Sequence, residues 1–171
     1  MTTGASSMRW YAVHVRSRHE FRVFSRLAEA GIEAFVPVVE RLQKWADRKK
    51  LVDFPLFPGY IFVHIPGAYD SMLAVLKKPG VVRFLGMVPG EPEPVPDEQV
   101  DSLKKLVSLK NEIDPYPFLK QGKQVRVKRG PLKGATGILT EKAGQHLFVV
   151  SIDILQQGVS VKIDASDIEA L

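Results

Sequence analysis

The segment FPLFPGYIFVHI at residues 54–65 constrains the fold most, because it joins a proline-braced bend to a strand. Pro58 cannot donate a hydrogen bond to a strand ladder, and Gly59 allows backbone angles that other residues avoid. We therefore predict a rigid bend that tips Phe57 and Tyr60 outward, onto a surface. The alternative is an ordinary core strand after a Pro-Gly turn, because aromatic side chains are usually buried. Period-two spacing groups four apolar side chains: Phe57, Tyr60, Phe62 and Ile65.

Length and composition indicate a globular protein of one or two small domains. The chain has 171 residues, of which 45% are hydrophobic and 25% are charged. It has no cysteine, which excludes disulfides and thiolate metal sites. Residues 1–7 lack the apolar core of a signal peptide and predict a disordered tail, and no apolar run approaches the ~20 residues that cross a bilayer. We expect a cytoplasmic monomer that does not bind membranes.

Charge is distributed unevenly along the chain. Residues 1–50 contain ten Lys and Arg against five Asp and Glu, whereas residues 91–115 contain three against seven. A basic first part followed by an acidic segment suggests a surface for a polyanion. The alternative is a solvated surface with no ligand.

The first hundred residues alternate between strand and helix patterns. Strands are predicted at residues 9–15, 32–38, 60–65 and 80–85, and helices at 18–30, 68–78 and from Asp97. Ser17 and Glu20 have the spacing of a capping box at the start of the first helix. The polar run at residues 40–50 predicts a hairpin arm or loop with Trp45 at its tip. The pattern describes an α/β sandwich of roughly 100 residues.

The two sides of the first predicted helix carry different residue types. The side expected to face the core carries Phe21, Phe24, Leu27 and Ala28. The other side carries three arginines, each four residues from the last, which predicts one exposed basic stripe. These are Arg18, Arg22 and Arg26.

The pattern changes after the third predicted helix. Residues 110–121 contain two prolines and no sustained period, so we predict a linker there. Residues 122–171 contain several short alternating segments separated by glycine turns, which predict a small all-β barrel. The predicted boundaries are a tail at 1–7, a first domain at 8–109, a linker at 110–121 and a second domain at 122–171.

The sequence contains no recognisable catalytic or metal-binding constellation. The glycines of GPLKGATG at residues 130–137 lack the spacing of a phosphate-binding loop. The four histidines lack metal-ligand spacing, so no metal and no cofactor is expected. Ser17 and His19 have no acid to orient them as a nucleophile and base. The chain is predicted to be a binding protein and not an enzyme.

Several motifs in order carry a resemblance to a known family. Trp10-Tyr11, the FPGY at residues 57–60 and the KPGVVRFLG at residues 78–86 resemble the NGN domain of NusG-type transcription factors. Residues 122–163, with VRVKRGPLKGATG near their start, resemble the KOW domain that follows it. The PLFP at residues 55–58 and the WADRKK at residues 45–50 are most similar to the specialised RfaH and UpxY paralogues.

The resemblance implies an α+β protein: an NGN-type sandwich of an antiparallel sheet with flanking helices, then a small SH3-like KOW barrel. In that family the NGN domain docks an apolar depression on the clamp helices of the RNA polymerase largest subunit. The resemblance implies that clamping suppresses pausing or termination by favouring the closed state, and that the RfaH-like members do so at specialised operons. The positions that match the docking surface are Trp10, Tyr11, Phe57, Pro58, Tyr60 and Phe84.

The resemblance implies further contacts. RfaH-like proteins read the displaced non-template DNA strand, and the basic positions that match or neighbour that site are Arg16, Arg22, Arg26, Lys77 and Lys78. The KOW domain of NusG recruits Rho or the ribosomal protein NusE, and the matching position is near Ile154 or Leu155. A core role for Leu155 is the alternative. Valines throughout the barrel favour strands over the helical refolding known for RfaH.

Two function hypotheses follow. The first is a transcription elongation or antitermination factor of this family. The alternative is a KOW-type RNA-binding protein of ribosome assembly or translation, which would leave the NGN-like half unexplained.

Overall fold

The computed structural model describes residues 7–86, 88, 90–110 and 112–171, and the chain divides into two compact units. The first unit contains residues 1–36 and 57–97, and the second contains residues 37–56 and 98–171. This division differs from the predicted domains at 8–109 and 122–171. All but the last residue of the predicted tail lies outside the described residues.

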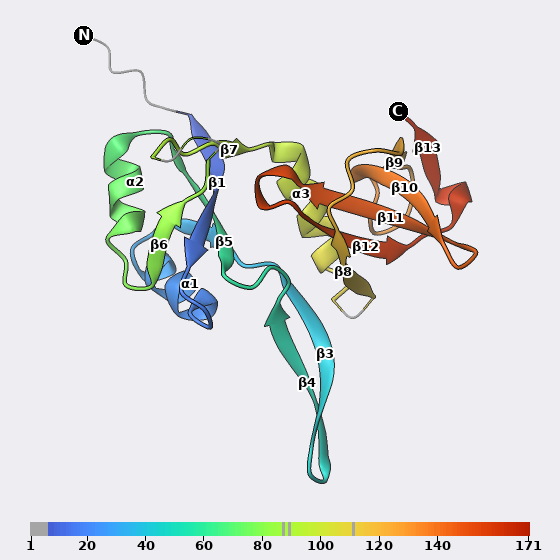
Figure 1. Ribbon diagram of the computed structural model, residues 1–171, viewed down its shortest axis with the longest axis horizontal. Coiled ribbons are helices and arrows are strands. Elements are labelled where there is room, and N and C mark those ends of the chain that lie inside the picture. Colours follow the sequence, from blue (N-terminus) through green and yellow to red (C-terminus); the bar gives the residue numbers. More distant parts are fainter. Residues whose placement is uncertain (1–6, 87, 89, 111) are drawn as a thin grey trace. The chain divides into compact units, whose positions relative to one another are not determined.

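The first unit is built on an antiparallel sheet with the order β2-β5-β1-β6. Strand β1 (Met8–Val15) lies between β5 (Tyr60–Pro66) and β6 (Val81–Phe84), and β2 (Glu33–Phe35) pairs with the other edge of β5. The short strand β7 (Pro94–Val95) also pairs with β1 (Figure 1). Strict alternation along β1 and β5 therefore gives this sheet two distinct faces.

One face of the sheet packs against the helices α1 (Glu20–Glu29) and α2 (Tyr69–Leu76). The core between them is apolar, and both helices and both central strands contribute to it. Its buried members are Tyr11, Val13, Val15, Val23, Leu27, Ile61, Val63, Ile65 and Val75. We call this side the helix-side face; the even-numbered residues of β1 and β5 point to the opposite side.

The second unit contains a hairpin, a helix and an all-β sheet. The hairpin pairs β3 (Val38–Trp45) with β4 (Arg48–Pro55) residue by residue, and Figure 1 shows it as a two-stranded arm. The predicted hairpin arm at residues 40–50 is therefore confirmed. Helix α3 (Asp97–Val107) buries Val100, Leu103 and Leu106 along one stripe.

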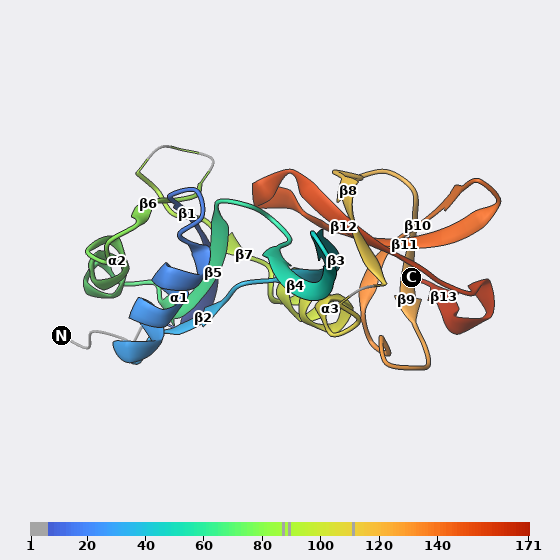
Figure 2. The ribbon, with the colours of Figure 1, turned by 90° about the horizontal axis from the view of Figure 1, so that it is seen from below.

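The C-terminal sheet has six antiparallel strands in the order β13-β9-β10-β11-β12-β8. Figure 2 shows β10, β11 and β12 side by side. The bounds are β8 (Ile113–Pro117), β9 (Lys123–Val127), β10 (Thr136–Lys142), β11 (Gln145–Ile152), β12 (Gln157–Lys162) and β13 (Ile168–Ala170), with short 3₁₀ helices η1 (Asp153–Leu155) and η2 (Ala165–Asp167). The α+β class with a C-terminal all-β region is confirmed.

Part of the predicted linker is a strand. Residues Ile113–Pro117 form β8, which pairs with β12 at the edge of the C-terminal sheet, and Ile113 is fully buried. Pro115 and Pro117 led to the linker prediction because proline cannot donate to a ladder. An edge strand needs only one bonded side, so it tolerates both.

Helix α3 is hydrogen bonded to the C-terminal sheet within the second unit. The Ser102 hydroxyl accepts a hydrogen bond from the Thr136 amide at 3.0 Å, and the Gln99 side chain accepts one from the Asp153 amide at 3.3 Å. Ser102 is buried, so its hydroxyl replaces water as the partner of a β10 amide.

Candidate functional site

The bend before β5 is fixed to β1 by a backbone hydrogen bond and is closed by a second one of its own. Gly59 has a φ of +86°, and its carbonyl accepts from the Val15 amide at 2.8 Å. The Tyr60 amide donates to the Phe57 carbonyl at 3.0 Å, which closes the turn. The rigid bend is confirmed, and the positive φ explains why glycine occupies its apex.

The Glu20 side chain binds this bend instead of capping its own helix. Its side chain accepts a hydrogen bond from the Gly59 amide at 3.2 Å, and Glu20 is buried. The N-cap of α1 is His19, which makes no side-chain cap hydrogen bond. The predicted Ser17–Glu20 capping box is therefore wrong: the orphan amide of the bend binds the carboxylate that the sequence pattern assigned to the helix end.

The buried side of α1 also differs from the predicted side. Its buried residues are Glu20, Val23 and Leu27, whereas Phe21 and Phe24 are 43% and 37% exposed. The predicted inner face is confirmed at Leu27 and is wrong at Phe21, Phe24 and Ala28, which are exposed. Because Glu20 is drawn inward to Gly59, the phenylalanine that follows it is turned outward.

The sheet face opposite the helices is rich in aromatic rings. Trp10 stacks on His64 with ring centroids 4.6 Å apart, and His64 also bonds to Glu33 at 2.8 Å. His14 packs beside Tyr60 at 5.3 Å. We call this set the aromatic face; its members are Trp10, His14, Phe35, Tyr60, Phe62 and His64.

The predicted exposed cluster is not present as one surface. Trp10 is 5% exposed and Phe57 is 1% exposed, so the prediction that Phe57 is tipped outward is wrong. A bend fixes the direction of the backbone, but the gain from burying a large ring decides where the side chain lies. Of the predicted residues near the bend, Pro58 is exposed and Tyr60 is half-buried.

Tyr11 and Phe84 belong to the helix-side face and not to the aromatic face. Tyr11 is buried in the core between sheet and helices, and Phe84 packs edge-on against it at 6.0 Å. Alternation along β1 forces Trp10 and Tyr11 to opposite sides, a consequence of strand geometry that the sequence analysis did not apply. For the same reason Ile65 lies apart from Phe62.

The same alternation identifies three residues that sequence analysis missed. His14, Phe35 and His64 share the aromatic face with Trp10, Tyr60 and Phe62. Counting in steps of two from Trp10 and from Tyr60 would have found the members on β1 and β5. Nδ1 of His14 is buried and has no hydrogen-bond partner among the described residues. Functional surfaces often contain such unsatisfied polar atoms.

The predicted basic residues meet around the loop that follows α2. Nη1 of Arg26 donates to the Pro79 carbonyl at 2.6 Å, and the Arg16 amide donates to the Gly80 carbonyl at 2.8 Å. The structure thus brings three segments together: the end of β1, helix α1 and the loop with Lys77 and Lys78. Arg16, Arg22 and Lys77 are exposed, while Arg26 and Lys78 are half-buried.

The predicted three-arginine stripe is shorter than expected. Arg18 has a φ of +65° and precedes the helix, which begins at Glu20. Only Arg22 and Arg26 are therefore four residues apart on α1. The guanidinium of Arg26 is held by its hydrogen bond to the Pro79 carbonyl. The exposed Arg22 is therefore more available to bind a ligand.

The positions matched to a KOW partner lie in η1. Ile154 is half-buried, and Leu155 is 8% exposed. Gln156 closes this turn with a φ of +53°. The exposure favours the core interpretation for Leu155 and leaves Ile154 as the accessible apolar side chain.

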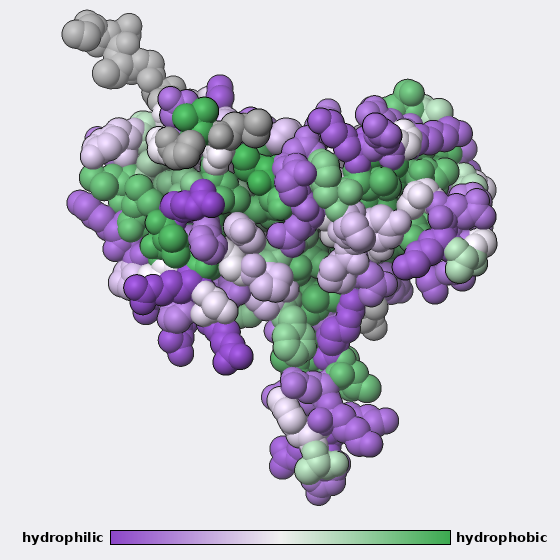
Figure 3. Space-filling model, viewed as in Figure 1, coloured by the Kyte–Doolittle hydropathy of each residue, from purple (hydrophilic) through white to green (hydrophobic). Residues whose placement is uncertain are grey.

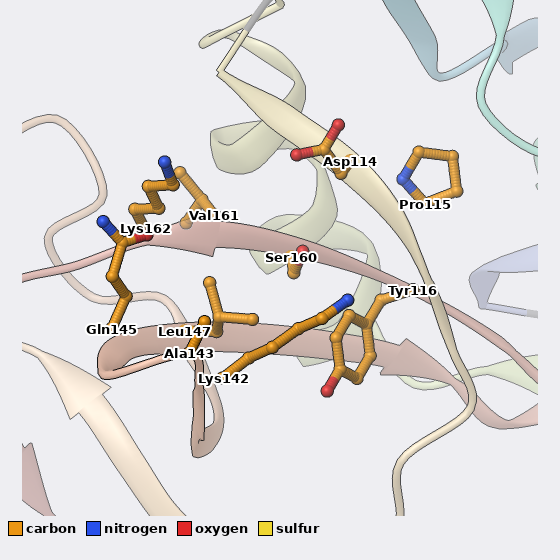
Figure 4. Close-up of a pocket in the computed structure, with 10 residues that line it drawn as sticks. All are labelled: Asp114, Pro115, Tyr116, Lys142, Ala143, Gln145, Leu147, Ser160, Val161 and Lys162. Atoms are coloured by element: carbon orange, nitrogen blue, oxygen red, sulfur yellow. The ribbon is translucent and has the colours of Figure 1, made fainter.

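The C-terminal sheet also carries a small pocket of about 280 Å³. Figure 4 shows lysine, glutamine and tyrosine side chains around it, from β8, β12 and the β10–β11 turn. Its ten lining residues are Asp114, Pro115, Tyr116, Lys142, Ala143, Gln145, Leu147, Ser160, Val161 and Lys162. The set contains no histidine or cysteine to serve as nucleophile or base, and sequence analysis singled out none of it.

Among the described residues, no cluster of three or more His, Asp or Glu side chains could hold a metal ion. No helix within those residues has the length and apolar character needed to cross a membrane.

A family model for NusG, described as transcription termination factor nusG, matches residues 8–104. The match covers more than half of the chain and includes the bend, the aromatic face and the basic loop. The chain belongs to the NusG family. The predicted family is thereby confirmed, and its homologues are transcription factors and not enzymes.

Similar proteins span almost the whole chain. A transcription termination/antitermination protein NusG of Staphylococcus carnosus (strain TM300) is 28% identical and covers 100% of both chains. The protein of the same name from Buchnera aphidicola subsp. Baizongia pistaciae (strain Bp) is 26% identical, over 94% of this chain and 95% of its own. Both are NusG proteins, so the closer likeness to RfaH and UpxY stays a prediction.

A solved structure supports the fold. The structure titled "Domain interaction in Thermotoga maritima NusG" matches with a TM-score of 0.50 and 24% identity, over 96% of this chain and 98% of that chain. The mixed α+β architecture of the NusG family, with a C-terminal all-β region consistent with a KOW domain, is therefore shown for this chain.

Proposed function

We propose that this NusG-family protein is a transcription elongation and antitermination factor, specialised for particular operons, that docks on the clamp helices of the RNA polymerase largest subunit. The observation that carries the proposal is the family match over residues 8–104. Transcription by the polymerase takes place in the cytoplasm of bacteria, which makes that compartment the one proposed for this chain.

The aromatic face is the docking surface that the geometry favours. Amphipathic helices bind where an apolar groove offers aromatic anchors, because rings bury a large area at low entropic cost. His14 and Tyr60 are its half-buried members near the bend, and the exposed Pro58 lies beside them in the bend itself. Its members Trp10 and Phe62 are buried, as is Phe57 in the bend, and Tyr11 and Phe84 lie on the opposite side of the sheet.

Docking would act by differential binding. A factor that binds the closed form of the polymerase more tightly than the open form shifts the population toward the closed form. Pausing and termination pass through more open states, so both would be suppressed without any chemistry by this chain.

The basic residues around the loop after α2 form the proposed contact with the non-template DNA strand. Arg16, Arg22 and Lys77 are exposed, and arginine can bind phosphates or stack on unpaired bases. Arg26 positions the loop through Pro79 and contributes charge behind it. The proposed KOW partner, NusE or Rho, would contact Ile154.

Binding to core RNA polymerase tests the docking proposal. Tyr60→Ala should weaken capture of the polymerase by at least about thirtyfold, the usual loss at an aromatic hot spot. Tyr69→Ala is the matched control, because Tyr69 is 77% exposed on α2, away from the aromatic face. Equal capture by wild type and Tyr60→Ala, with both folded, would contradict the docking assignment.

Mobility-shift assays of polymerase elongation complexes at several salt concentrations test the DNA contact. Arg22→Gln should lower the affinity and reduce the salt dependence by roughly one phosphate contact. Lys123→Gln, an exposed lysine on β9, is the control. An unchanged salt slope for Arg22→Gln would mean that the basic surface is merely solvated.

A further inference from the structure

The β3–β4 arm is anchored at its base and free at its tip. Nη2 of Arg41 donates to the Ile113 carbonyl at 2.7 Å and pairs with Asp114 at 2.9 Å. The Glu40 amide donates to the Lys110 carbonyl at 3.2 Å. Within the described chain, residues 42–51 form no hydrogen bond or ion pair with another element. The arm therefore presents its tip from a fixed base.

The free part of the arm exposes large apolar side chains. Trp45 is 48% exposed, and Leu42 and Leu51, which face each other across the two strands, are 59% and 55% exposed. An isolated two-stranded hairpin is marginally stable in water, so exposed apolar groups on it are costly to keep. Because alternation puts Trp45 on the opposite face from Leu42 and Leu51, each face of the arm offers its own apolar group to a bound molecule.

The charge at the tip indicates what that molecule is. The tip, residues 44–50, carries Lys44, Arg48, Lys49 and Lys50 against the single acid Asp47. Lys44 lies directly opposite Lys49, a cross-strand arrangement that destabilises a hairpin. None of these four cations has an ion-pair partner among the described side chains. Figure 3 shows the end of the arm as mostly hydrophilic. Such unpaired positive charge complements a polyanion.

We propose that the tip of the β3–β4 arm binds an unpaired nucleic-acid strand, with Trp45 stacked on a base and the surrounding cations on its phosphates. Trp45 and Arg48 face each other across the hairpin, and Lys50 lies two residues further along the same face. A ring between cations is the combination that proteins use for single strands. A base pair within a duplex offers no free face to such a ring, so the site favours unpaired strands.

This site is separate from the proposed non-template contact. It lies in the second unit, on residues 44–50, whereas the contact around the loop after α2 lies in the first unit. It also makes no use of the aromatic face. Each proposal can therefore fail without the other.

The full chain contains an intrinsic reporter for the arm. It has two tryptophans, of which Trp10 is 5% exposed and Trp45 is 48% exposed. Titration with an oligothymidylate of roughly 12 nucleotides, or the matching oligouridylate, should quench the exposed tryptophan. Neither stacking nor phosphate contact requires a 2′-hydroxyl, so quenching by either strand supports the proposal. Equal quenching by a blunt duplex of the same length would overturn it.

Variants assign the binding to the arm. Trp45→Ala should weaken binding of a labelled oligothymidylate on the order of tenfold, and Trp45→Phe should retain most of the affinity because it keeps a ring. Replacing Lys44, Arg48 and Lys50, of which Arg48 and Lys50 share the face of Trp45, with glutamine should lower the logarithmic salt slope by about two. The same three replacements at exposed lysines outside the arm, Lys123, Lys133 and Lys142, are the control.

Two results of these binding measurements would contradict the assignment of the site to the arm. Wild-type affinity in Trp45→Ala, or an equal loss in the control triple variant, would overturn the assignment. Because the tip is exposed, an unchanged melting temperature in each variant separates binding from folding. Polymerase capture should be unchanged in Trp45→Ala, and Trp45 quenching should be unchanged in Tyr60→Ala, which keeps this result distinct from that for the proposed function.

Discussion

Glu20 shows how one side chain determines the local structure of the candidate site. A carboxylate at the third position of a capping box was expected to bind its own helix end, yet it holds the Gly59 amide 39 residues away. The sequence contains both a helix end and a distant glycine amide that Glu20 could bind. Local spacing does not show which of these two contacts is the more stable. Burial of the carboxylate inside the first unit then sets the rotation of α1.

Removing this carboxylate should destabilise the protein. Glu20→Ala leaves the partly buried Gly59 amide without its partner, which costs about 1–3 kcal/mol of unfolding free energy. Urea unfolding of the full chain measures the loss. Glu29→Ala, at the exposed end of the same helix, should change stability by less than about 0.5 kcal/mol. Equal effects of the two substitutions would mean that the Glu20–Gly59 contact contributes nothing.

Phe57 should behave as a core residue. Because it is 1% exposed, Phe57→Ala should lower the unfolding free energy by about 3–5 kcal/mol. Pro58→Ala, at the exposed neighbouring position, should cost far less. Denaturant midpoints of the two variants compare them directly. A Phe57→Ala protein of wild-type stability would restore the original prediction that this ring lies on a surface.

At the scale of elements, periodicity predicted where most helices and strands occur and which side of α3 is buried, but it misplaced the buried side of α1. The predicted strand at residues 9–15 corresponds to β1, and the predicted helix from Asp97 corresponds to α3. Strand β8 was missed because Pro115 and Pro117 exclude a central strand, and only the completed sheet shows that this segment lies at an edge. Edge position is a property of topology that local sequence does not contain.

Helix α3 should depend on its buried serine. Ser102→Ala removes the acceptor of the Thr136 amide and should lower the stability of the second unit by about 1–3 kcal/mol. Hydrogen exchange at the Thr136 amide is the direct measurement, and this exchange should accelerate. Ser108→Ala, near the exposed end of the same segment, is the control. Unchanged protection of Thr136 in Ser102→Ala would show that the hydrogen bond is not maintained in solution.

At the scale of the whole molecule, the order of motifs predicted the family better than it predicted the site. The family match over residues 8–104 confirms the NusG assignment. Of the six residues expected to form one docking surface, Trp10 and Tyr60 lie on one face of the sheet and Tyr11 and Phe84 on the other, while Phe57 and Pro58 lie in the bend before β5. Sequence motifs identify relatives because they occur in the same order along related chains. Which residues share a surface depends instead on strand alternation and burial.

The most direct measurement of the central claim is site-specific cross-linking in a complex with RNA polymerase. A photoreactive phenylalanine analogue at Tyr60, on the aromatic face, should cross-link to the clamp helices of the polymerase largest subunit. The same analogue at the exposed Tyr69 should not. Cross-links from position 69 alone, or from neither position while the protein stays bound, would contradict the claim that the aromatic face docks on the polymerase.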